Sequence, residues 1–483
     1  MRVAMIGAGS IGFTRRIMMD LLAVPEFRNT EFSFMDIDPE GLEMSTNLCR
    51  KMIADNDLPV TITATTDRRA ALQGADYVLS FVRVGGLEAF AHDIEVPLRY
   101  GVDQCVGDTL GPGGIFYGLR TIPVLVGIAR DMEEICPQAL LLNYSNPMAM
   151  NCWAVNRATS IAMLGLCHGV QGGHHQIAIA LGVPAEEVEF VAAGLNHQTW
   201  YIQVRHKGKD MLPHLLNAFE ANESLRNSEP VRIDIMRRFG YYSTESNGHL
   251  SEYLMWYRKR PEEIQKWIHP DVWIGGETGG YLRVCREGAD YYRSMYPRWM
   301  AGEEPIRVGD RSQEHASHII EALETGRTYR GHLNVPNTGL ITNLPEGCII
   351  EIPCLVDGSG IQPTFIGALP MGPAAICRQT VSVQELTVEA ALTGDKDLVR
   401  QAMALDPLAG SKCNLDEIWA MTDDMFEALA PWLPQFESPG ESPARRPSAR
   451  LRLARSAGSA PGAGEGDAAK VLRETFNLRG KEN

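Results

Sequence analysis

Three glycines near the start of the chain are spaced in the pattern that binds a dinucleotide. Gly7, Gly9 and Gly12 form G-x-G-x-x-G directly after the apolar run 3–6 and directly before residues of helical periodicity. The first glycine permits a tight turn, the second lets the backbone approach a pyrophosphate, and the third allows close helix packing. The pyrophosphate then lies at the helix N-terminus, where free N–H groups favour an anion.

A carboxylate after the second apolar run favours NAD over NADP. Asp36 directly follows the run 31–35, where a carboxylate accepts hydrogen bonds from both ribose hydroxyls and repels a 2′-phosphate. Asp38 is the alternative at this position. Together with the glycines, Ser10, Ile11 and Asp36 make up the predicted cofactor site.

Two later segments carry side chains that bind transition metals. Cys167 directly follows the apolar run 161–166, and His197 lies in the segment Gly-Leu-Asn-His-Gln-Thr-Trp. One thiolate and one imidazole suit a divalent metal with open positions for substrate oxygens. The spacing alone is a weak signal, because single cysteines are more often buried apolar residues. His174 and His175 are rival histidines.

Two further segments are predicted to lie near a ligand. Residues 142–148, Leu-Asn-Tyr-Ser-Asn-Pro-Met, are a strand end followed by an Asn-Pro turn. Ligands of open α/β sheets bind at the carboxyl ends of the strands. Asp108 opens the segment Asp-Thr-Leu-Gly-Pro-Gly-Gly, whose glycines allow a loop to approach a ligand.

The elements that must position these residues follow an alternating pattern. Apolar runs predict strands, separated by helical stretches such as 14–22 and 115–132, at 3–6, 31–35, 60–64, 77–81, 139–143 and 161–166. Strands that alternate with helices predict the α/β class, with a doubly wound, Rossmann-like parallel sheet.

The pattern changes near residue 190, where strands mix with long helical pieces such as 312–325 and 387–393. We therefore expect an NAD-binding domain over 1–190 and an α+β substrate domain over 191–436. Beyond these, Ser, Pro, Gly and Arg dominate 437–483, which predicts disorder over 437–467 and a weak helix over 468–478.

Composition narrows the function class. The chain has 483 residues and a formal net charge of -15, which argues against a nucleic-acid surface. Its ten cysteines include no CxxC pair, as is usual in a reducing compartment. We expect no segment long and apolar enough to cross a bilayer and no room for a signal peptide before the first strand. The predicted location is the cytoplasm.

Several of these segments together resemble glycoside hydrolase family four. The matching motifs occur in the family's order, at 7–12, 35–38, 108–114, 143–148, 167–170, 196–197 and 241–257. The resemblance covers about residues 1 to 435. It implies NAD and a divalent metal, usually Mn²⁺, as cofactors, and a small-molecule glycoside as substrate. Members commonly assemble as dimers or tetramers.

The resemblance also implies an unusual route to glycoside hydrolysis. Oxidation of the sugar at C3 by NAD⁺ acidifies the proton at C2, which a base removes. The glycosidic oxygen then leaves, water adds, and the stored hydride returns to C3. The metal holds the C2 and C3 oxygens as a Lewis acid.

Carried over by position, the resemblance implies that Cys167 and His197 are the protein ligands of the metal. It implies that Asn146 contacts the substrate and that Asp108 lies near the sugar. His168 would help the leaving oxygen depart or hold a C2 or C3 oxygen. The alternative for His168 is a residue that orients the metal site from outside it.

The same resemblance points to the base. The run 241–253 aligns with the segment that supplies the proton acceptor, a tyrosine in many members, so Tyr253 is the predicted base. A phenol has a pKa of about 10, so the metal and NAD⁺ would have to favour its phenolate. Glu252 and His249 are rivals with more convenient acidity. The alternative for Tyr253 is an ordinary packed aromatic.

The motifs also bear on the sugar. Cys167-His168 fits the branch that acts on unphosphorylated α-glycosides, whereas the phospho-sugar branch carries Cys-Asn or Cys-Asp. The run 241–253 most resembles the α-galactosidases of melibiase type. One departure is Gly169, where enteric melibiases have serine. Cys-His-Gly also occurs in α-glucosidases of the family, so an α-glucosidase is one alternative.

Three other functions remain open. An α-galacturonidase would need a cationic partner for the substrate carboxylate, and the candidates are Arg83, Arg258 and Arg283. An NAD-dependent dehydrogenase of malate or lactate type would need no cysteine ligand. A nucleotide sensor would need no Cys-His pair beside the Asn-Pro turn.

Overall fold

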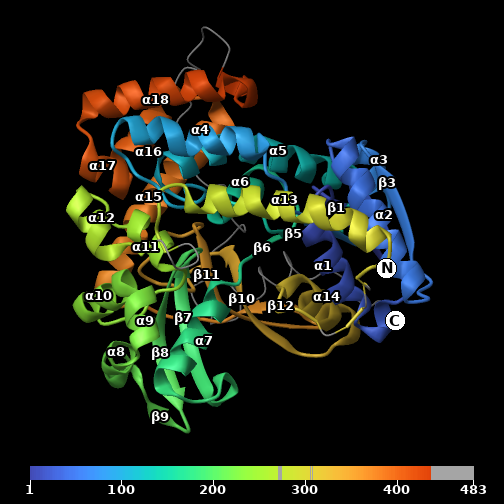
Figure 1. The fold of residues 1–483 in the computed structure, drawn as a ribbon, viewed down its shortest axis with the longest axis horizontal. Coiled ribbons are helices and arrows are strands. Elements are labelled where there is room, and N and C mark those ends of the chain that lie inside the picture. Colours follow the sequence, from blue (N-terminus) through green and yellow to red (C-terminus); the bar gives the residue numbers. More distant parts are fainter. Residues whose placement is uncertain (270–274, 305, 307, 310, 437–483) are drawn as a thin grey trace, which may run out of the picture.

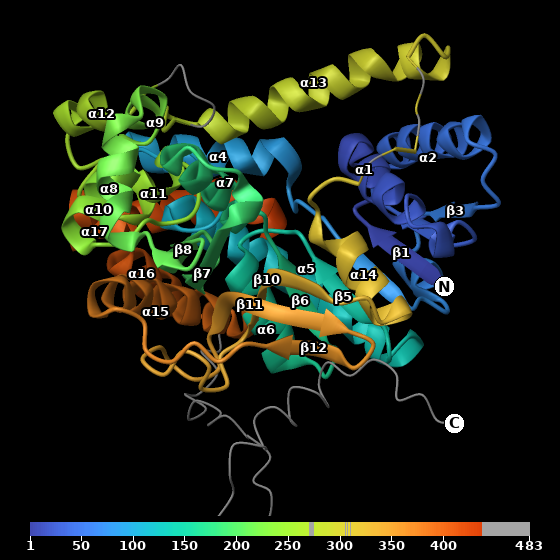
Figure 2. The same cartoon turned by 90° about the horizontal axis from the view of Figure 1, so that it is seen from below.

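The computed structural model of the chain describes residues 1–269, 275–304, 306, 308–309 and 311–436. A sheet of twelve strands runs through these residues, and helices cover both of its faces (Figures 1 and 2). The predicted disorder over 437–467 and the weak helix over 468–478 lie outside the described residues.

Six parallel strands form the N-terminal part of the sheet, in the order β3-β2-β1-β4-β5-β6. Their bounds are β1 Arg2–Ile6, β2 Glu31–Met35, β3 Thr61–Thr65, β4 Tyr77–Ser80, β5 Leu140–Asn143 and β6 Met163–Leu166. Each predicted strand is present. The strands β4, β5 and β6 are buried along their whole length, as expected between two layers of helices. The predicted doubly wound parallel sheet is confirmed.

The remaining strands pair antiparallel and come from later residues. Outward from β6 the order is β10 Tyr329–Pro336, β11 Ile349–Asp357, β7 Val188–Leu195, β8 Gln198–His206 and β9 Lys209–Asp210, with β12 Gly360–Pro363 on β11. The strands β10 and β11 therefore lie between β6 and β7, although both follow β7 in the chain by more than a hundred residues. Backbone hydrogen bonds thus join the parallel part of the sheet to the α+β part.

Helices pack on the sheet and at its ends. In the first part of the chain they are α1 Ile11–Leu22, α2 Pro39–Asp55, α3 Arg68–Leu72, α4 Gly86–Arg99, α5 Gly111–Ile135, α6 Met148–Ala158 and α7 Gly169–Leu181. The middle helices are α8 Leu212–Ala221, α9 Glu223–Ser228, α10 Pro230–Phe239, α11 Asn247–Tyr253, α12 Pro261–Trp267 and α13 Gly280–Met300.

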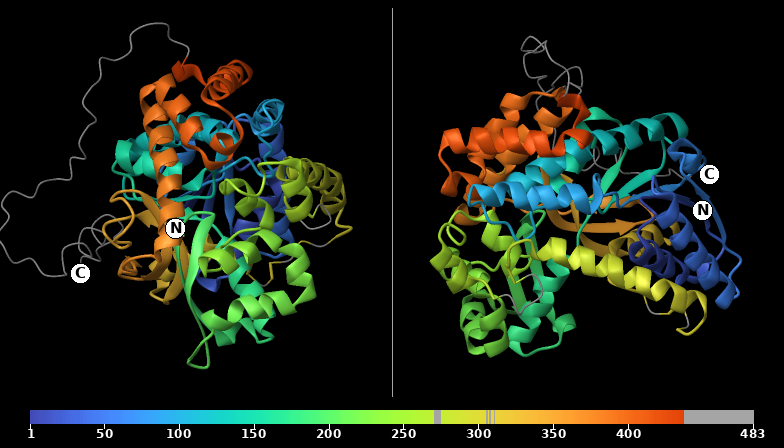
Figure 3. Two further views of the ribbon diagram at one scale, coloured as in Figure 1. Left: turned by 90° about the vertical axis from the view of Figure 1, so that its left-hand side faces the viewer. Right: turned by 45° about the horizontal axis from the view of Figure 1, so that its top comes forward.

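The last helices return to the first part of the fold. They are α14 His315–Thr325, α15 Met371–Thr393, α16 Lys396–Leu405, α17 Pro407–Lys412 and α18 Leu415–Leu429. The orange and red helices α15, α16 and α18 pack against α4 and α5 (Figure 3). Short 3-10 helices lie at Pro25–Phe27, Ala185–Glu187, Ala430–Trp432 and Pro434–Phe436.

One expectation from composition is wrong. The helix α5 is long and apolar enough to cross a membrane by length and composition, whereas we expected no such segment. In the fold, 83% of its most apolar window is buried. The helix packs against α4, α6 and α15 and is therefore apolar because it lies in the core.

Candidate active site

The glycine loop follows β1 and is closed by tight contacts. Gly7 has a φ of 92°, and a Cβ at this position would lie 3.0 Å from the carbonyl carbon of Phe81. The Gly9 N–H donates to Asp36 Oδ2 at 2.7 Å, and a Cβ on Gly9 would lie 2.8 Å from the same oxygen. Both positions therefore need glycine, as the dinucleotide pattern requires.

The two candidate ribose carboxylates differ in their partners. Asp36 Oδ1 accepts a hydrogen bond from the Asp38 N–H at 3.0 Å, which holds Asp36 beside the glycine loop. Asp38 instead caps α2, where its Oδ1 accepts a hydrogen bond from the Glu40 N–H at 3.1 Å. Asp36 contacts the glycine loop directly, whereas Asp38 lies at the start of α2, so the geometry favours Asp36 for the ribose.

The third glycine packs against a distant helix. A Cβ on Gly12 would lie 2.1 Å from the ring of Tyr292, which belongs to α13. This long helix spans from the middle helices to α2 (Figures 1 and 2). Nearby, the Arg15 guanidinium lies over the Trp299 ring, 4.6 Å from its centroid. The third glycine therefore permits close packing, as predicted, and its partner is α13.

A cavity of about 330 Å³ lies at the carboxyl ends of the central strands. Ligands of open α/β sheets bind at this edge. The cavity is lined by Ser10 of the glycine loop, Asn146 after β5, Cys167 and His168 after β6, and His197 and Glu245 from the second half. The predicted cofactor loop, substrate residue and metal ligands thus share one cavity. The peptide bond between Asn146 and Pro147 is cis.

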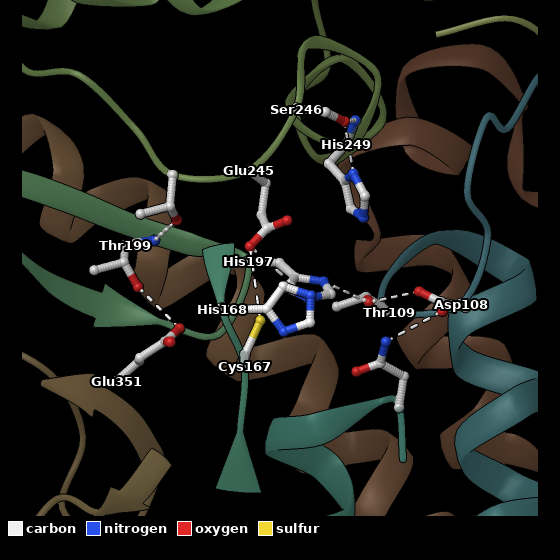
Figure 4. A network of polar contacts seen from close by, with 12 residues as sticks. Asp108, Thr109, Cys167, His168, His197, Thr199, Glu245, Ser246, His249 and Glu351 are labelled. Carbon is white, nitrogen blue, oxygen red and sulfur yellow. Dashed lines mark hydrogen bonds and ion pairs between the residues drawn. The ribbon is translucent and has the colours of Figure 1, made fainter. Parts of the chain in front are cut away.

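Three possible metal ligands converge in this cavity. A sulfur of Cys167, a ring nitrogen of His197 and a carboxylate oxygen of Glu245 lie within 4.8 Å of one another (Figure 4). The distance from Cys167 Sγ to Glu245 Oε1 is 3.7 Å, and that from His197 Nε2 to the same oxygen is 4.0 Å. The structure thus brings the predicted Cys-His pair together and adds a carboxylate.

This donor set fits a divalent transition metal. Thiolate, imidazole and carboxylate together suit ions such as Mn²⁺ or Zn²⁺ better than Ca²⁺. The histidines around Glu245 hold its pKa below the usual range although burial alone would raise it, so the carboxylate is ionised. Burial and the nearby carboxylates raise the pKa of the Cys167 thiol, so metal binding has to release its proton.

Two of these residues have an unusual backbone. His197 has a φ of 61° in the turn between β7 and β8, and Glu245 has a φ of 74° in the loop before α11. A left-handed conformation at a residue other than glycine costs on the order of 1–3 kcal/mol. Such residues cluster at functional sites, where the surrounding structure holds a side chain in place.

A threonine connects the histidine ligand to a carboxylate. Thr109 Oγ1 lies 2.9 Å from His197 Nδ1 and donates to Asp108 Oδ1 at 2.9 Å. Because the hydroxyl hydrogen is directed to Asp108, Nδ1 carries the ring proton and donates it to Thr109 Oγ1. The lone pair of Nε2 is then left for a metal. Metal-bound histidines are usually oriented by such an outer partner.

Asp108 and Asn146 lie together at the cavity wall. The Asn146 side-chain N–H donates to Asp108 Oδ2 at 3.1 Å, and the Arg83 guanidinium lies 3.5 Å from the same oxygen. All three residues line the cavity. The two predicted substrate residues are therefore neighbours, and the glycine-rich segment does bring Asp108 to a cavity.

The three candidate bases lie in different surroundings. His249 lines the cavity, its Nδ1 lies 2.7 Å from Ser246 Oγ, and burial lowers its pKa to about 4. Tyr253 is not among the lining residues. Its hydroxyl lies 3.4 Å from His197 Nδ1, and burial together with nearby carboxylates raises its pKa.

Glu252 is engaged elsewhere. Its two carboxylate oxygens accept hydrogen bonds from the backbone N–H groups of Cys105, Val106 and Gly107, at 2.7, 2.9 and 3.0 Å. These residues directly precede Asp108 and Thr109. Glu252, a rival base in the sequence analysis, thus anchors the loop that carries Asp108 and Thr109.

Gly169 leaves room for the Glu245 carboxylate, which is the third possible metal ligand. A Cβ at this position would lie 1.4 Å from Glu245 Oε1. Any side chain here therefore collides with the carboxylate in its present position. The glycine at position 169 is thus matched to the placement of Glu245.

The three candidate arginines are separated by the fold. Arg83 lines the cavity, where its guanidinium lies over the rings of Phe90 and Tyr117. Arg258 forms a buried ion pair with Asp103 at 2.7 Å, and the half-exposed Arg283 pairs with two glutamates of the surrounding loop and helix. Arg83 is the one of the three that faces the cavity.

Sequence reasoning missed Glu245 and Thr109. Glu245 lies in the quoted run 241–253, but the residues around it form an irregular loop with no periodicity that would indicate its direction. Thr109 follows Asp108 in the quoted glycine-rich segment. Only the folded structure shows that its hydroxyl reaches His197.

Comparisons with known proteins point to one family. Residues 2–183 match the model of family 4 glycosyl hydrolases, and residues 192–409 match that of the family's C-terminal domain. An α-galactosidase of Rhizobium meliloti is 52% identical over 439 residues, which is 90% of this chain and 89% of the relative. An α-galactosidase of Bacillus subtilis is 38% identical over 90% of this chain and 100% of the relative.

A solved structure has the same fold. It is that of a 6-phospho-β-glucosidase from Thermotoga maritima with manganese, NAD⁺ and glucose 6-phosphate. It superposes with a TM-score of 0.73, covering 89% of this chain and 99% of that chain, at 23% sequence identity. The parallel sheet, its antiparallel continuation and the helices around them are thus an established architecture.

Proposed function

The chain belongs to family 4 of the glycosyl hydrolases, and from that premise we propose that it hydrolyses unphosphorylated α-galactosides with NAD and a divalent metal such as Mn²⁺. The two α-galactosidase relatives, at 52% and 38% identity, support the choice of sugar. Only one lysine or arginine, Arg83, lines the described cavity, which offers little to a phosphate group.

One observation carries this proposal: the Cys167, His197 and Glu245 cluster opens into the same cavity as the dinucleotide loop. A dehydrogenase of malate or lactate type needs no such cluster beside its cofactor. A nucleotide sensor needs neither the cluster nor the substrate-facing residues around it. Redox chemistry and Lewis-acid chemistry on one sugar explain why the two sets of residues meet.

When bound, NAD supplies reversible oxidation at the sugar C3 and the metal supplies a Lewis acid for the sugar oxygens. The glycine loop and Asp36 hold the cofactor, and Cys167, His197 and Glu245 hold the metal. Asn146, held by Asp108, is placed to accept or donate hydrogen bonds to the sugar. His168 gives a proton to the glycosidic oxygen as the C1–O bond breaks, and takes one from the water that adds at C1.

Geometry and resemblance point to different residues as the base that takes the C2 proton. Geometry favours His249, because it lines the cavity and Tyr253 is not among the lining residues. The resemblance implies Tyr253. We therefore propose His249 as the acceptor to be tested against Tyr253.

Solvent exchange distinguishes these two residues. In D₂O with NAD⁺ and Mn²⁺, the wild type should incorporate deuterium at C2 of galactose, measured by NMR. His249→Gln should lose this exchange by about 100-fold or more, the size of a general-base contribution, while Tyr253→Phe should retain it. The reverse result would assign the base to Tyr253.

A direct assay tests the activity. The protein is incubated with p-nitrophenyl α-galactoside, NAD⁺, Mn²⁺ and a thiol reductant, and nitrophenol release is expected to vanish when NAD⁺ or the metal is withheld. Net NADH accumulation would instead indicate a dehydrogenase. Cys167→Ser is expected to abolish the activity, and full activity in this variant would refute the metal site.

A second candidate sugar is favoured by Arg83, whose Nη1 is buried without a hydrogen-bond partner among the described residues. Such a group would suit the carboxylate of an α-galacturonide. The α-galacturonide and the α-glucoside are therefore assayed beside the α-galactoside. A higher kcat/KM for either would replace the proposed sugar.

We also propose the features of the whole protein that the sequence suggested. These are a division into an NAD-binding domain over 1–190 and a substrate domain over 191–436, a cytoplasmic location, a homodimer or homotetramer, and no nucleic-acid or membrane partner. The acidic net charge of -15 supports the absence of a nucleic-acid surface.

A further inference from the structure

A buried glutamate outside the cavity lining faces His168. The side chain of Glu314 is 7% exposed, and its Oε2 lies 3.7 Å from His168 Nδ1. This oxygen is buried and has no hydrogen-bond partner among the described residues. A buried acceptor left without a partner is destabilising, so its position calls for an explanation.

Capping of α14 does not explain this side chain. Glu314 is the residue before the first turn of α14, but its side chain makes no capping hydrogen bond. Its backbone N–H donates to Ser312 Oγ at 3.2 Å. Ser312 is in turn held by Asp20 of α1, whose Oδ1 accepts a hydrogen bond from the Ser312 N–H at 2.8 Å. The helix of the glycine loop therefore fixes the segment that carries Glu314.

The start of α14 is also tied to the cavity. His315 Nε2 lies 2.9 Å from the carbonyl oxygen of Cys167, the residue before His168. The Ala316 N–H donates to the hydroxyl of Tyr144, which lines the cavity. Glu314 is thus held from three directions, while the side chain of His168 is 62% exposed and has freedom to rotate.

We propose that Glu314 is the positioning residue for His168. Its carboxylate accepts a hydrogen bond from Nδ1–H and so turns the other ring nitrogen toward the glycosidic oxygen. A small rotation of the exposed imidazole closes the 3.7 Å gap to hydrogen-bond length. Catalytic hydrogen bonds are often longer before the substrate is bound.

The inference rests on the proposed function, in which His168 is the proton donor. Nε2–H gives its proton to the leaving oxygen while the electron pair of the C1–O bond moves onto that oxygen. The neutral imidazole keeps its Nδ1 proton and donates it in a hydrogen bond to the Glu314 carboxylate. When water adds at C1, its proton returns to Nε2, so the residue ends each cycle as it began.

Substrates with different leaving groups test this role. Nitrophenol leaves without help from an acid, whereas the methanol of methyl α-galactoside needs a proton. Glu314→Ala should lower kcat on methyl α-galactoside by about 10-fold or more, the size of an outer-partner effect. On p-nitrophenyl α-galactoside kcat should fall by a smaller factor, because His168 then acts only in the addition of water, and KM should be unchanged on both substrates. Glu314→Gln, which keeps an acceptor oxygen, should recover part of the loss.

Two controls separate positioning from general damage. Glu321→Gln, on the same helix, removes a carboxylate that pairs with Arg311 and Arg327 and should act like the wild type on both substrates. His168→Gln should show the same selective loss, and adding Glu314→Ala to it should cause no further loss. Equal loss on both substrates, no loss at all, or additive losses would overturn the proposal.

A measurement without turnover keeps the two proposals distinguishable. NMR of ¹⁵N-histidine-labelled protein, with His168 assigned from His168→Gln, reports which ring nitrogen carries the proton of the neutral ring. The wild type should hold it on Nδ1, and Glu314→Ala should lose this preference. An unchanged ring in Glu314→Ala overturns the positioning role. Absence of any NAD- and metal-dependent hydrolysis by the wild type overturns the proposed function instead.

Discussion

Thr109 acts through a single hydroxyl that joins a carboxylate to a metal-facing imidazole. Thr109→Val keeps the shape of the side chain but leaves His197 Nδ1 and Asp108 without this partner. The dissociation constant for Mn²⁺ is expected to rise by about 10- to 100-fold. The measurement is a titration in which electron paramagnetic resonance detects free Mn²⁺. Thr109→Ser should bind like the wild type, and equal affinity in the valine variant would refute the role.

Gly169 is expected to control the metal site by its lack of a side chain. Gly169→Ala places a Cβ where the Glu245 carboxylate lies, so that carboxylate must move. The Mn²⁺ dissociation constant should rise by about 10-fold or more, as for other disturbed metal sites. Gly169 is the first residue of α7, where the helix-interior gain from alanine does not apply, so displacement of the buried carboxylate should also lower thermal stability.

Gly172 provides the matched control on the same helix. A Cβ at this position meets nothing within 4 Å, so Gly172→Ala should keep wild-type metal affinity and gain a little thermal stability. If both alanine variants bind Mn²⁺ like the wild type, the proposed contribution of Glu245 to the metal site is wrong.

Single residues were predictable where they lie in a recognisable motif. Cys167 and His197 were predictable because their segments resemble the family's motifs, whereas their types and spacing alone are a weak signal. Glu245 was not recognisable, because carboxylates are common and its direction depends on a left-handed backbone in an irregular loop. Glu314 was not predictable either, since its contact with His168 joins residues 146 positions apart.

At the scale of elements, α11 and the loop before α5 are connected by one side chain. Glu252→Ala leaves the three backbone N–H groups of residues 105–107 without their acceptor. Each buried group without a partner costs roughly 1–3 kcal/mol, so the free energy of unfolding should fall by about 3 kcal/mol or more. Urea unfolding measures this loss.

Glu252→Gln is the control for this connection, because it keeps one acceptor oxygen and the volume of the side chain. It should lose less stability than Glu252→Ala. If the alanine variant unfolds at the same urea concentration as the wild type, the loop does not depend on this anchor. If it instead keeps its stability and loses C2 proton exchange, Glu252 would be restored as a candidate base.

The strands could be predicted from the sequence, but their pairing partners in the sheet could not. The apolar runs of β1, β4, β5 and β6 indicate buried parallel strands, because such strands are covered on both faces. Nothing in the local sequence of β10 indicates that it pairs with β6, since pairing partners are selected by the whole fold. The glycine pattern also did not reveal that α13 covers Gly12, for the same reason.

For the whole molecule, a buried carboxylate predicts how stability changes with pH. Glu351 lies in β11 with Oε1 unpartnered among the described residues, and burial raises its pKa from 4.5 to about 8. Between these pH values the folded protein holds a proton that the unfolded chain has lost. The contribution of Glu351 to the free energy of unfolding should therefore fall as pH rises from 4.5 to about 8.

Removal of this titration should flatten the pH profile. Glu351→Gln is neutral at every pH, so in metal-free protein its stability relative to the wild type should increase as the pH rises through that window. Urea unfolding at several pH values in the presence of a chelator measures the difference. Parallel profiles for the two proteins would show that Glu351 is already ionised in the folded state.

The insertion of β10 between β6 and the later strands has a consequence for synthesis on the ribosome. The strand β6 ends at Leu166, but its antiparallel partner begins at Tyr329. At about 5–20 residues per second, the ribosome needs on the order of 10–30 seconds to make the intervening residues. During that time the nascent chain carries an unpaired apolar sheet edge, which is the kind of surface that aggregates or recruits chaperones. The same sheet that brings the NAD-binding and metal-binding residues into one cavity is therefore incomplete until β10 has been synthesised.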